Sequence, residues 1–283
     1  MRTSQEMMDV ILGTAKQDAR VRAVIMNGSR VNPLVTPDRF QDYDIVYFVS
    51  DIESFTRDHS WVDVFGERLI MQMPDAMQLY SGDGSNPHRF AYLMQFTDGN
   101  RIDLTLITTA HLPDKFDSLS KVLLDKDGII PFLPEANDSD YHVKKPSEKD
   151  FAACSNEFWW VSTYVAKGLW RRELPYAKAM MEGPVRNMLE RMIAWYIGTK
   201  NEFGVSVGSQ GKYFEYYLDQ ATWNAYVATF TDGSYENCWR GLFAMCDLFI
   251  KIGGETAESL HYHPPVEMQV YEYLEKVRRM PQK

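Results

Sequence analysis

The stretch VIMNGSRVNPLVTPDRFQDYDIVYFV, residues 24–49, has a Gly-Ser pair at the end of one apolar run and two aspartates at the start of the next. The apolar runs predict short buried strands at 21–26 and 43–49. At a strand end, Gly28 lets the backbone approach a phosphate, and the Ser29 hydroxyl and nearby N–H groups can donate hydrogen bonds to it. Alone, a Gly-Ser pair is more often an ordinary turn.

Asp42 and Asp44 lie two residues apart where the second run begins. Residues two apart on a strand point to the same face, so both carboxylates share one side of the sheet, while Tyr43 and Ile45 face the opposite layer. Adjacent carboxylates repel each other unless a cation lies between them, and Mg²⁺ prefers carboxylate and phosphate oxygens. A lone Asp-x-Asp pair is nevertheless more often a solvated strand start.

Asp103 is a third carboxylate, within RIDLTLI, residues 101–107, where polar and apolar residues alternate. The alternation predicts a strand that carries Asp103 on its polar face. A Gly-Ser turn, an Asp-x-Asp pair and an aspartate on a later strand together resemble the nucleotidyltransferase superfamily. Nucleotidyl transfer depends on positioning and charge neutralisation, commonly with metal ions. We expect Asp42 and Asp44 to hold a triphosphate-bound Mg²⁺, and Asp103 to hold a second metal ion or to accept the proton of the attacking hydroxyl.

The rest of the N-terminal half predicts a mixed α/β layout around one sheet. Residues 97–100 predict a hairpin turn in which Gly99 supplies a positive φ. The stretch SGDGSNPH, residues 81–88, predicts a mobile loop. Further elements are expected in four ranges: strands at 68–73 and 90–96, and helices at about 4–18 and 51–60.

The C-terminal half predicts a helical domain. Residues 112–146 are rich in Pro, Asp and Lys, so we place the domain boundary at their end, with one domain at 1–146 and the other at 147–283. Ser147 is the expected N-cap of a helix that runs to Lys167. Further helices are expected at about 174–199, 212–230, 235–252 and 265–279. The fold class is therefore α+β: a mixed β-sheet with flanking helices, followed by an all-helical domain.

The composition predicts a globular protein of the reducing cytoplasm. Hydrophobic residues make up 45% of the chain, enough for a sizeable core, and no apolar run approaches the ~18 residues that a membrane span needs. Acidic residues and Gln interrupt the N-terminal apolar residues, which predict an amphipathic helix rather than a signal peptide. The three cysteines lack a CxxC spacing, which argues against a disulfide framework or a thiolate zinc site.

The net charge of −9 argues weakly against nucleic acid as the main ligand. A protein that binds nucleic acid usually carries a basic surface, because neutralising phosphates supplies much of the affinity. An acidic surface is suited to attracting a cation instead.

Six stretches, three around the aspartates and three in the helical half, carry a more specific resemblance: VIMNGSRVNP (24–33), QDYDI (41–45), DGNRIDLTL (98–106), NEFWW (156–160), KGLWR (167–171) and EGPVR (182–186). They resemble the aminoglycoside 6-adenylyltransferases that inactivate streptomycin. The resemblance covers nearly the whole chain and includes the helical half, which usually defines the acceptor. It implies ATP as donor, transfer of AMP to a hydroxyl of streptomycin, and pyrophosphate as leaving group.

Several basic residues are candidates for phosphate binding. Arg30, next to the Gly-Ser turn, can assist in holding the terminal phosphates. The superfamily resemblance implies that a lysine on a helix of the second domain neutralises the β- and γ-phosphates. Lys212 is our first candidate and Lys178 our second, although each alone is equally well explained as a solvated surface residue. The stretch GSQGK, residues 208–212, is too short and irregular to be a P-loop.

Acidic and aromatic residues are candidates for acceptor binding, because guanidinium groups such as those of streptomycin favour such walls. We nominate Glu157 and Trp160, at the start of the second domain's first helix, and Asp75 and Glu182 as weaker candidates. At least one of the neighbouring Trp159 and Trp170 is expected in the core. A solvated helix face remains the simpler explanation for any one of these residues.

Two alternatives stay open at this point. The first is the same chemistry on another acceptor, namely a different aminoglycoside, a lincosamide or a protein side chain. The second is a non-catalytic protein of nucleotidyltransferase fold, such as an antitoxin-like binding partner. The intact set of Gly28, Ser29 and the three aspartates speaks against the second alternative. The sequence leaves open the oligomeric state, the number of metal ions and the choice between ATP and GTP.

Overall fold

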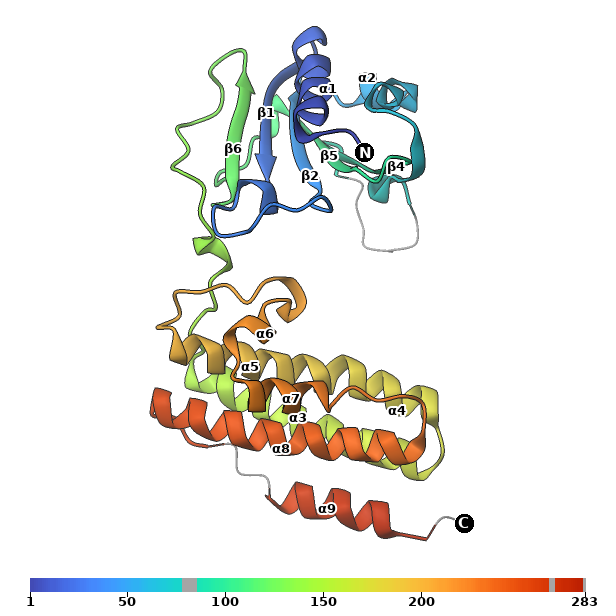
Figure 1. Ribbon diagram of the computed structural model, residues 1–283, viewed down its shortest axis with the longest axis vertical. Coiled ribbons are helices and arrows are strands. Elements are labelled where there is room, and N and C mark those ends of the chain that lie inside the picture. The colour runs from blue at the N-terminus through green and yellow to red at the C-terminus, as the bar shows by residue number, and fades with distance from the viewer. Residues whose placement is uncertain (78–85, 265–267, 282–283) are drawn as a thin grey trace. The chain divides into compact units, whose positions relative to one another are not determined.

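The computed structural model describes residues 1–77, 86–264 and 268–281. Contacts within the chain define two compact units, Met1–Asp140 and Tyr141–Lys283, each of which is described by itself (Figure 1). The sequence placed the boundary six residues further on, between 146 and 147. Most of the loop that the sequence predicts at 81–88 lies outside the described residues.

The first unit is built on a mixed six-stranded sheet with the order β3-β4-β5-β2-β1-β6. Among the described residues, β2 and β5 form the one parallel pair, and the other neighbours are antiparallel. The mixed sheet confirms the predicted fold class. Sequence reasoning missed β6, which lies in the segment rich in Pro and Asp. The strands are β1 (Val21–Asn27), β2 (Tyr43–Val49), β3 (Arg68–Gln72), β4 (Arg89–Phe96), β5 (Arg101–Thr108) and β6 (Ser120–Asp125).

Helices α1 (Ser4–Gln17) and α2 (Glu53–Thr56) cover one face of this sheet (Figure 1). The single helix predicted at 51–60 is wrong, because α2 ends at Thr56 and a 3₁₀ helix, His59–Phe65, follows. Asp58 causes the break: its backbone is extended and its side chain caps the 3₁₀ helix by accepting from the Ser60 N–H.

Alternation along β2 separates the two faces of the sheet. Tyr43, Ile45 and Tyr47 are buried against α1, whereas Val46 and Phe48 belong to a smaller cluster on the opposite face. Asp44 therefore lies on the face that the helices leave open, as the sequence predicts.

The second unit is helical, which also confirms the fold class. Its helices α3, α5 and α8 pack side by side (Figure 1). Their core includes the stacked rings of Phe158 and Phe249, whose centroids are 3.9 Å apart. The helices are α3 (Glu148–Trp170), α4 (Leu174–Met180), α5 (Arg186–Lys200), α6 (Phe214–Tyr217), α7 (Gln220–Val227), α8 (Tyr235–Leu260) and α9 (Met268–Arg279).

Some of the predicted helical ranges are confirmed and others are wrong. Helices α4 and α5 are joined by a π-helical turn, Met181–Val185, so the prediction at 174–199 is confirmed. The helix predicted at 212–230 is wrong, because Asp219 adopts an extended backbone and caps α7 separately from α6. The first helix begins after Ser147, the predicted N-cap, and continues three residues beyond Lys167.

The three cysteines are buried and free, and Trp159 is buried in the helical core. This agrees with a packing role for these side chains. No helix in the described ranges is long and apolar enough to cross a lipid bilayer.

Ser147→Ala is expected to lower the free energy of unfolding by about 1 kcal/mol, since it removes a capping box. In that box Ser147 Oγ accepts from the Asp150 N–H at 3.1 Å, and the Asp150 carboxylate accepts from the Ser147 N–H at 3.2 Å. Urea denaturation followed by circular dichroism measures the change.

Ser234→Ala is the matched control, because Ser234 is the N-cap of α8 but makes no side-chain capping bond to that helix. This control is expected to change the free energy of unfolding by less than about 0.5 kcal/mol. Equal losses in the two variants would contradict the capping explanation.

Candidate functional site

The register of the sheet brings two of the three predicted catalytic aspartates, Asp44 and Asp103, into one row on its open face, and Asp42 lies in the loop directly before β2. Asp44 lies directly opposite Asp103 in the parallel β2–β5 pair and opposite Asn27 in the β1–β2 pair. Gly28 and Ser29 follow Asn27 immediately, so the Gly-Ser turn, Asp44 and Asp103 lie on three neighbouring strands. Strands in a sheet are about 4.8 Å apart, which sets the spacing of this row.

Gly28 cannot be replaced without disturbing the site. Its φ is +77°, a conformation that favours glycine. A Cβ atom at this position would lie 2.2 Å from Asp44 Oδ2. The glycine is therefore required both for the turn and for the close approach of the backbone to the Asp44 carboxylate.

Holding the carboxylates of Asp42, Asp44 and Asp103 near one another costs electrostatic free energy. Burial raises the pKa of Asp44 to about 6, and the charges of Asp103 and Asp42 add to this effect. Burial also raises the pKa of Asp42, and the nearby Arg101 guanidinium opposes that rise. A cation bound at this cluster would relieve the repulsion.

Arg101 is the residue that sequence reasoning missed. Its Nε donates to Asp103 Oδ1 at 2.8 Å and its Nη2 to Asp103 Oδ2 at 2.7 Å, a bidentate ion pair. Arg101 Nε also lies 3.6 Å from Asp42 Oδ2. The signal was available, since an Arg and an Asp two residues apart on one strand share a face.

The donor set fits Mg²⁺ that arrives with a phosphate ligand. Within the described ranges, no three acidic, His or Cys side chains converge closely enough to hold a metal ion by themselves. Mg²⁺ usually takes one or two protein carboxylates and completes its shell with substrate phosphates and water. Asp42 and Asp44, with raised pKa values, suit that role, and the assignment of metal to these residues and to Asp103 stays a prediction.

Arg30 holds the loop that carries Asp42 in place through hydrogen bonds. Its Nε donates to the Asp42 carbonyl at 3.0 Å and its Nη2 to the Gln41 carbonyl at 2.7 Å. The guanidinium carbon lies 3.6 Å from the centre of the Tyr43 ring. These contacts give Arg30 a positioning role, and its contact with a phosphate stays a prediction.

Asp75 is anchored within the first unit. Its Oδ2 accepts from the Ala91 N–H at 2.7 Å, and its Oδ1 lies 3.6 Å from the Arg89 guanidinium. These contacts tie the turn after β3 to β4. They account for the aspartate without an acceptor, so its role in substrate binding stays a prediction.

The two candidate lysines of the second unit differ in their surroundings. Lys178 Nζ lies 3.0 Å from Glu182 Oε1 and donates to the Thr231 carbonyl at 3.1 Å. Lys212 is exposed, follows the short turn Ser209–Gly211, and lies 5.1 Å from the Tyr213 ring centre. Lys212 is therefore the more available of the two for a phosphate.

Glu157 and Trp160 lie three residues apart on α3 and are both exposed, Trp160 with 59% of its surface. The indole N–H of Trp160 donates to the Tyr164 hydroxyl at 2.6 Å, which holds the ring on the helix surface. A carboxylate beside an aromatic ring is a suitable surface for an organic cation.

A family model and two named relatives agree on one family. The family model described as streptomycin adenylyltransferase matches residues 1–277. A Bacillus subtilis aminoglycoside 6-adenylyltransferase is 41% identical over 98% of both chains. A Campylobacter jejuni protein of the same name is 42% identical over 94% of this chain and 92% of its own. A crystal structure of an aminoglycoside 6-adenyltransferase from Bacillus subtilis has a TM-score of 0.49 and 37% identity over 99% of this chain.

Asp44→Asn is expected to stabilise the protein at neutral pH only. The pKa of Asp44 is about 6 in the folded protein and 3.8 ordinarily, so folding takes up a proton between these values. The free energy of unfolding therefore falls as the pH rises from about 4 to 6, and the penalty is complete above 6. Removing the charge should raise this free energy by about 1–3 kcal/mol at about pH 7.5 and change it little at about pH 4.

Urea denaturation at both pH values, without divalent cations, measures this effect. Saturating Mg²⁺ should narrow the difference between the variant and the wild type at neutral pH. A gain of equal size at both pH values would show that the Asp44 charge is not the cause.

Proposed function

Because the chain belongs to the streptomycin adenylyltransferase family of nucleotidyltransferase enzymes, we propose that it transfers AMP from ATP to the 6-hydroxyl of streptomycin and releases pyrophosphate. The row formed by Gly28, Asp44 and Asp103 is the observation that carries this proposal. It brings the Gly-Ser turn, Asp44 and Asp103 together on neighbouring strands, which supports roles for them in phosphate binding, cation binding and proton transfer. Family relatives are named as aminoglycoside 6-adenylyltransferases, which supports the acceptor class.

The donor triphosphate belongs at the β1 end of the row. Gly28 lets the backbone of the turn approach the Asp44 carboxylate closely, and Ser29 contributes a hydroxyl for the phosphates. Asp42 and Asp44 would hold Mg²⁺, which neutralises charge on the phosphates when it is bound. Lys212 is the candidate in the helical unit for the β- and γ-phosphates, ahead of Lys178, which is already paired with Glu182.

Asp103 takes the proton of the acceptor. The hydroxyl oxygen attacks the α-phosphorus, the bond from that phosphorus to the bridging oxygen of pyrophosphate breaks, and the hydroxyl proton passes to the Asp103 carboxylate. Arg101 occupies one lone pair on each oxygen of Asp103, so each oxygen keeps another to accept the proton. The ion pair also holds the carboxylate in position.

Streptomycin carries guanidinium groups, and two features of the protein suit them. The first is the acidic cluster of the first unit, whose repulsion a cation relieves. The second is the exposed pair of Glu157 and Trp160 on α3. Modification of the antibiotic in the cytoplasm, where ATP is available, would confer resistance on the cell.

Two other acceptor classes compete within the same chemistry, another aminoglycoside and a lincosamide. The alternative of a non-catalytic antitoxin-like protein is set aside, because the chain belongs to a family of enzymes.

The direct test is pyrophosphate release from ATP and Mg²⁺ with a panel of aminoglycosides and a lincosamide. We expect release with streptomycin and a product heavier by one adenylyl group. Asp103→Asn and Asp42→Asn should each lower turnover by about 100-fold or more with little loss of stability, because both act on developing charge or on the proton.

Asp114→Asn is the control variant, since Asp114 is exposed in the loop after β5. It should keep wild-type turnover. Release with a different acceptor only would remove streptomycin from the proposal, and unchanged turnover in Asp103→Asn would remove the proton-acceptor role.

A further inference from the structure

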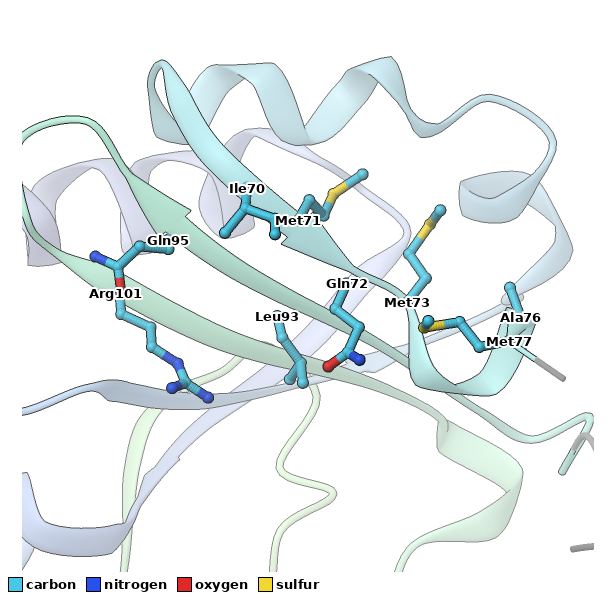
Figure 2. A pocket seen from close by; sticks show the side chains of 9 residues that line it. All are labelled: Ile70, Met71, Gln72, Met73, Ala76, Met77, Leu93, Gln95 and Arg101. Atoms are coloured by element: carbon cyan, nitrogen blue, oxygen red, sulfur yellow. The ribbon is translucent and has the colours of Figure 1, made fainter. Parts of the chain in front are cut away.

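A largely apolar hollow of about 670 Å³ opens beside the row of aspartates, within the first unit (Figure 2). Its residues come from β3 and the turn after it, from β4, and from the start of β5. Ile70 and Leu93 line it together with three methionines between 71 and 77. Two amides, Gln72 and Gln95, and the Arg101 guanidinium supply its polar groups. The volume is within the range of pockets that hold small molecules.

The hollow continues the catalytic row across the sheet. Leu93 lies opposite Asp103 in the β4–β5 pair, and Gln72 lies opposite Leu93 in the β3–β4 pair. Figure 2 shows the side chains of Gln72, Leu93 and Arg101 extending to the same side of the sheet. With strands about 4.8 Å apart, Leu93 lies about 5 Å and Gln72 about 10 Å beyond Asp103.

The order of the strands places the Gly-Ser turn and the hollow on opposite sides of Asp103. The Gly-Ser turn that suits the donor phosphates follows β1, two strands before the strand of Asp103. The hollow lies over β4 and β3, on the other side of Asp103. A hydroxyl that attacks in line, and gives its proton to Asp103, approaches from the side opposite the leaving pyrophosphate. The hollow is therefore on the acceptor's side of the reaction.

The charge and polarity of the residues that line the hollow indicate which part of the acceptor can bind there. None of the described lining residues is acidic, and Arg101 contributes a positive charge. Arg101 is already paired with Asp103, so the hollow offers a guanidinium or ammonium group no carboxylate of its own, whereas the C–H faces of a sugar ring suit the aliphatic walls formed by Ile70 and Leu93. Gln72 and Gln95 can bond to hydroxyl groups. Gln95 Nε2 already donates to the Asn100 carbonyl at 2.9 Å, which leaves its own carbonyl oxygen to accept.

We propose that this hollow binds the sugar ring of the aminoglycoside that carries no amino group. The proposal rests on the proposed function and assigns one subsite to it. Binding covers Ile70, which is 67% exposed on edge strand β3. It also places the guanidinium-bearing ring next to Asp103 and the other carboxylates.

Two neighbouring residues on β3 give a matched pair of variants. Ile70 lines the hollow and Leu69 does not, while their exposures are similar, at 67% and 71%. Ile70→Trp fills part of the hollow and is expected to raise the KM for streptomycin about tenfold, with the KM for ATP unchanged. Leu69→Trp should leave both constants near their wild-type values. Leu93→Ala, which loosens the wall, should raise the KM for streptomycin about fivefold.

A fragment of streptomycin tests which ring the hollow binds. The guanidinium-bearing ring of streptomycin without its sugars has no neutral ring for the hollow. Calorimetry should therefore give the same affinity for this fragment with the wild type and with Ile70→Trp, while intact streptomycin binds the variant about tenfold more weakly.

The outcomes separate the subsite from the proposed function. A rise in the KM for ATP in Ile70→Trp would place the nucleotide base in the hollow and overturn the proposal. Unchanged constants for both substrates would also overturn it. If wild-type protein releases no pyrophosphate with streptomycin, the proposed reaction fails, and the calorimetric comparison still decides whether the hollow binds the antibiotic.

Discussion

The parallel pairing of β2 with β5 is the constraint on which the site depends. It places Asp44 and Asp103 on adjacent strands, in register, on the face that α1 and α2 leave open. A slip of one residue would move one of the aspartates into the apolar layer, where Tyr43 and Ile102 are buried. The buried residues of the opposite face therefore hold the acidic residues in place, and the repulsion between the carboxylates is the cost of that arrangement.

Sequence patterns predicted the catalytic residues of this site and their strands better than the elements around them. The alternation of 101–107 predicts the strand and the polar face of Asp103, and the structure agrees. Short-range signals failed where one acidic residue intervenes: Asp58 and Asp219 each adopt an extended backbone and cap a new helix, which divides the helices predicted there. Strand β6 was missed because its apolar core is short and is flanked by residues typical of loops.

The remaining features depend on contacts between residues distant in sequence, which no local pattern contains. The sequence places Arg30 next to a Gly-Ser turn but does not show that its guanidinium donates to the carbonyls of Gln41 and Asp42. The sequence likewise does not show that the Asp75 carboxylate accepts a hydrogen bond from the Ala91 N–H of β4. The hollow exists because β3 and β4 extend the sheet beyond Asp103, a consequence of the strand order rather than of any one segment.

Charge is distributed along the row in a way that can orient an acceptor. Asp42, Asp44 and Asp103 concentrate negative charge at the centre, and Arg101 neutralises part of it and faces the hollow. A cation gains most at the carboxylates, whereas a neutral ring gains by burying its C–H faces in the hollow, against Ile70 and Leu93. A molecule with a cationic ring and a neutral ring therefore has one preferred direction across β5, β4 and β3. That direction brings a hydroxyl of the cationic ring to Asp103, which is the geometry that adenylyl transfer to that ring requires.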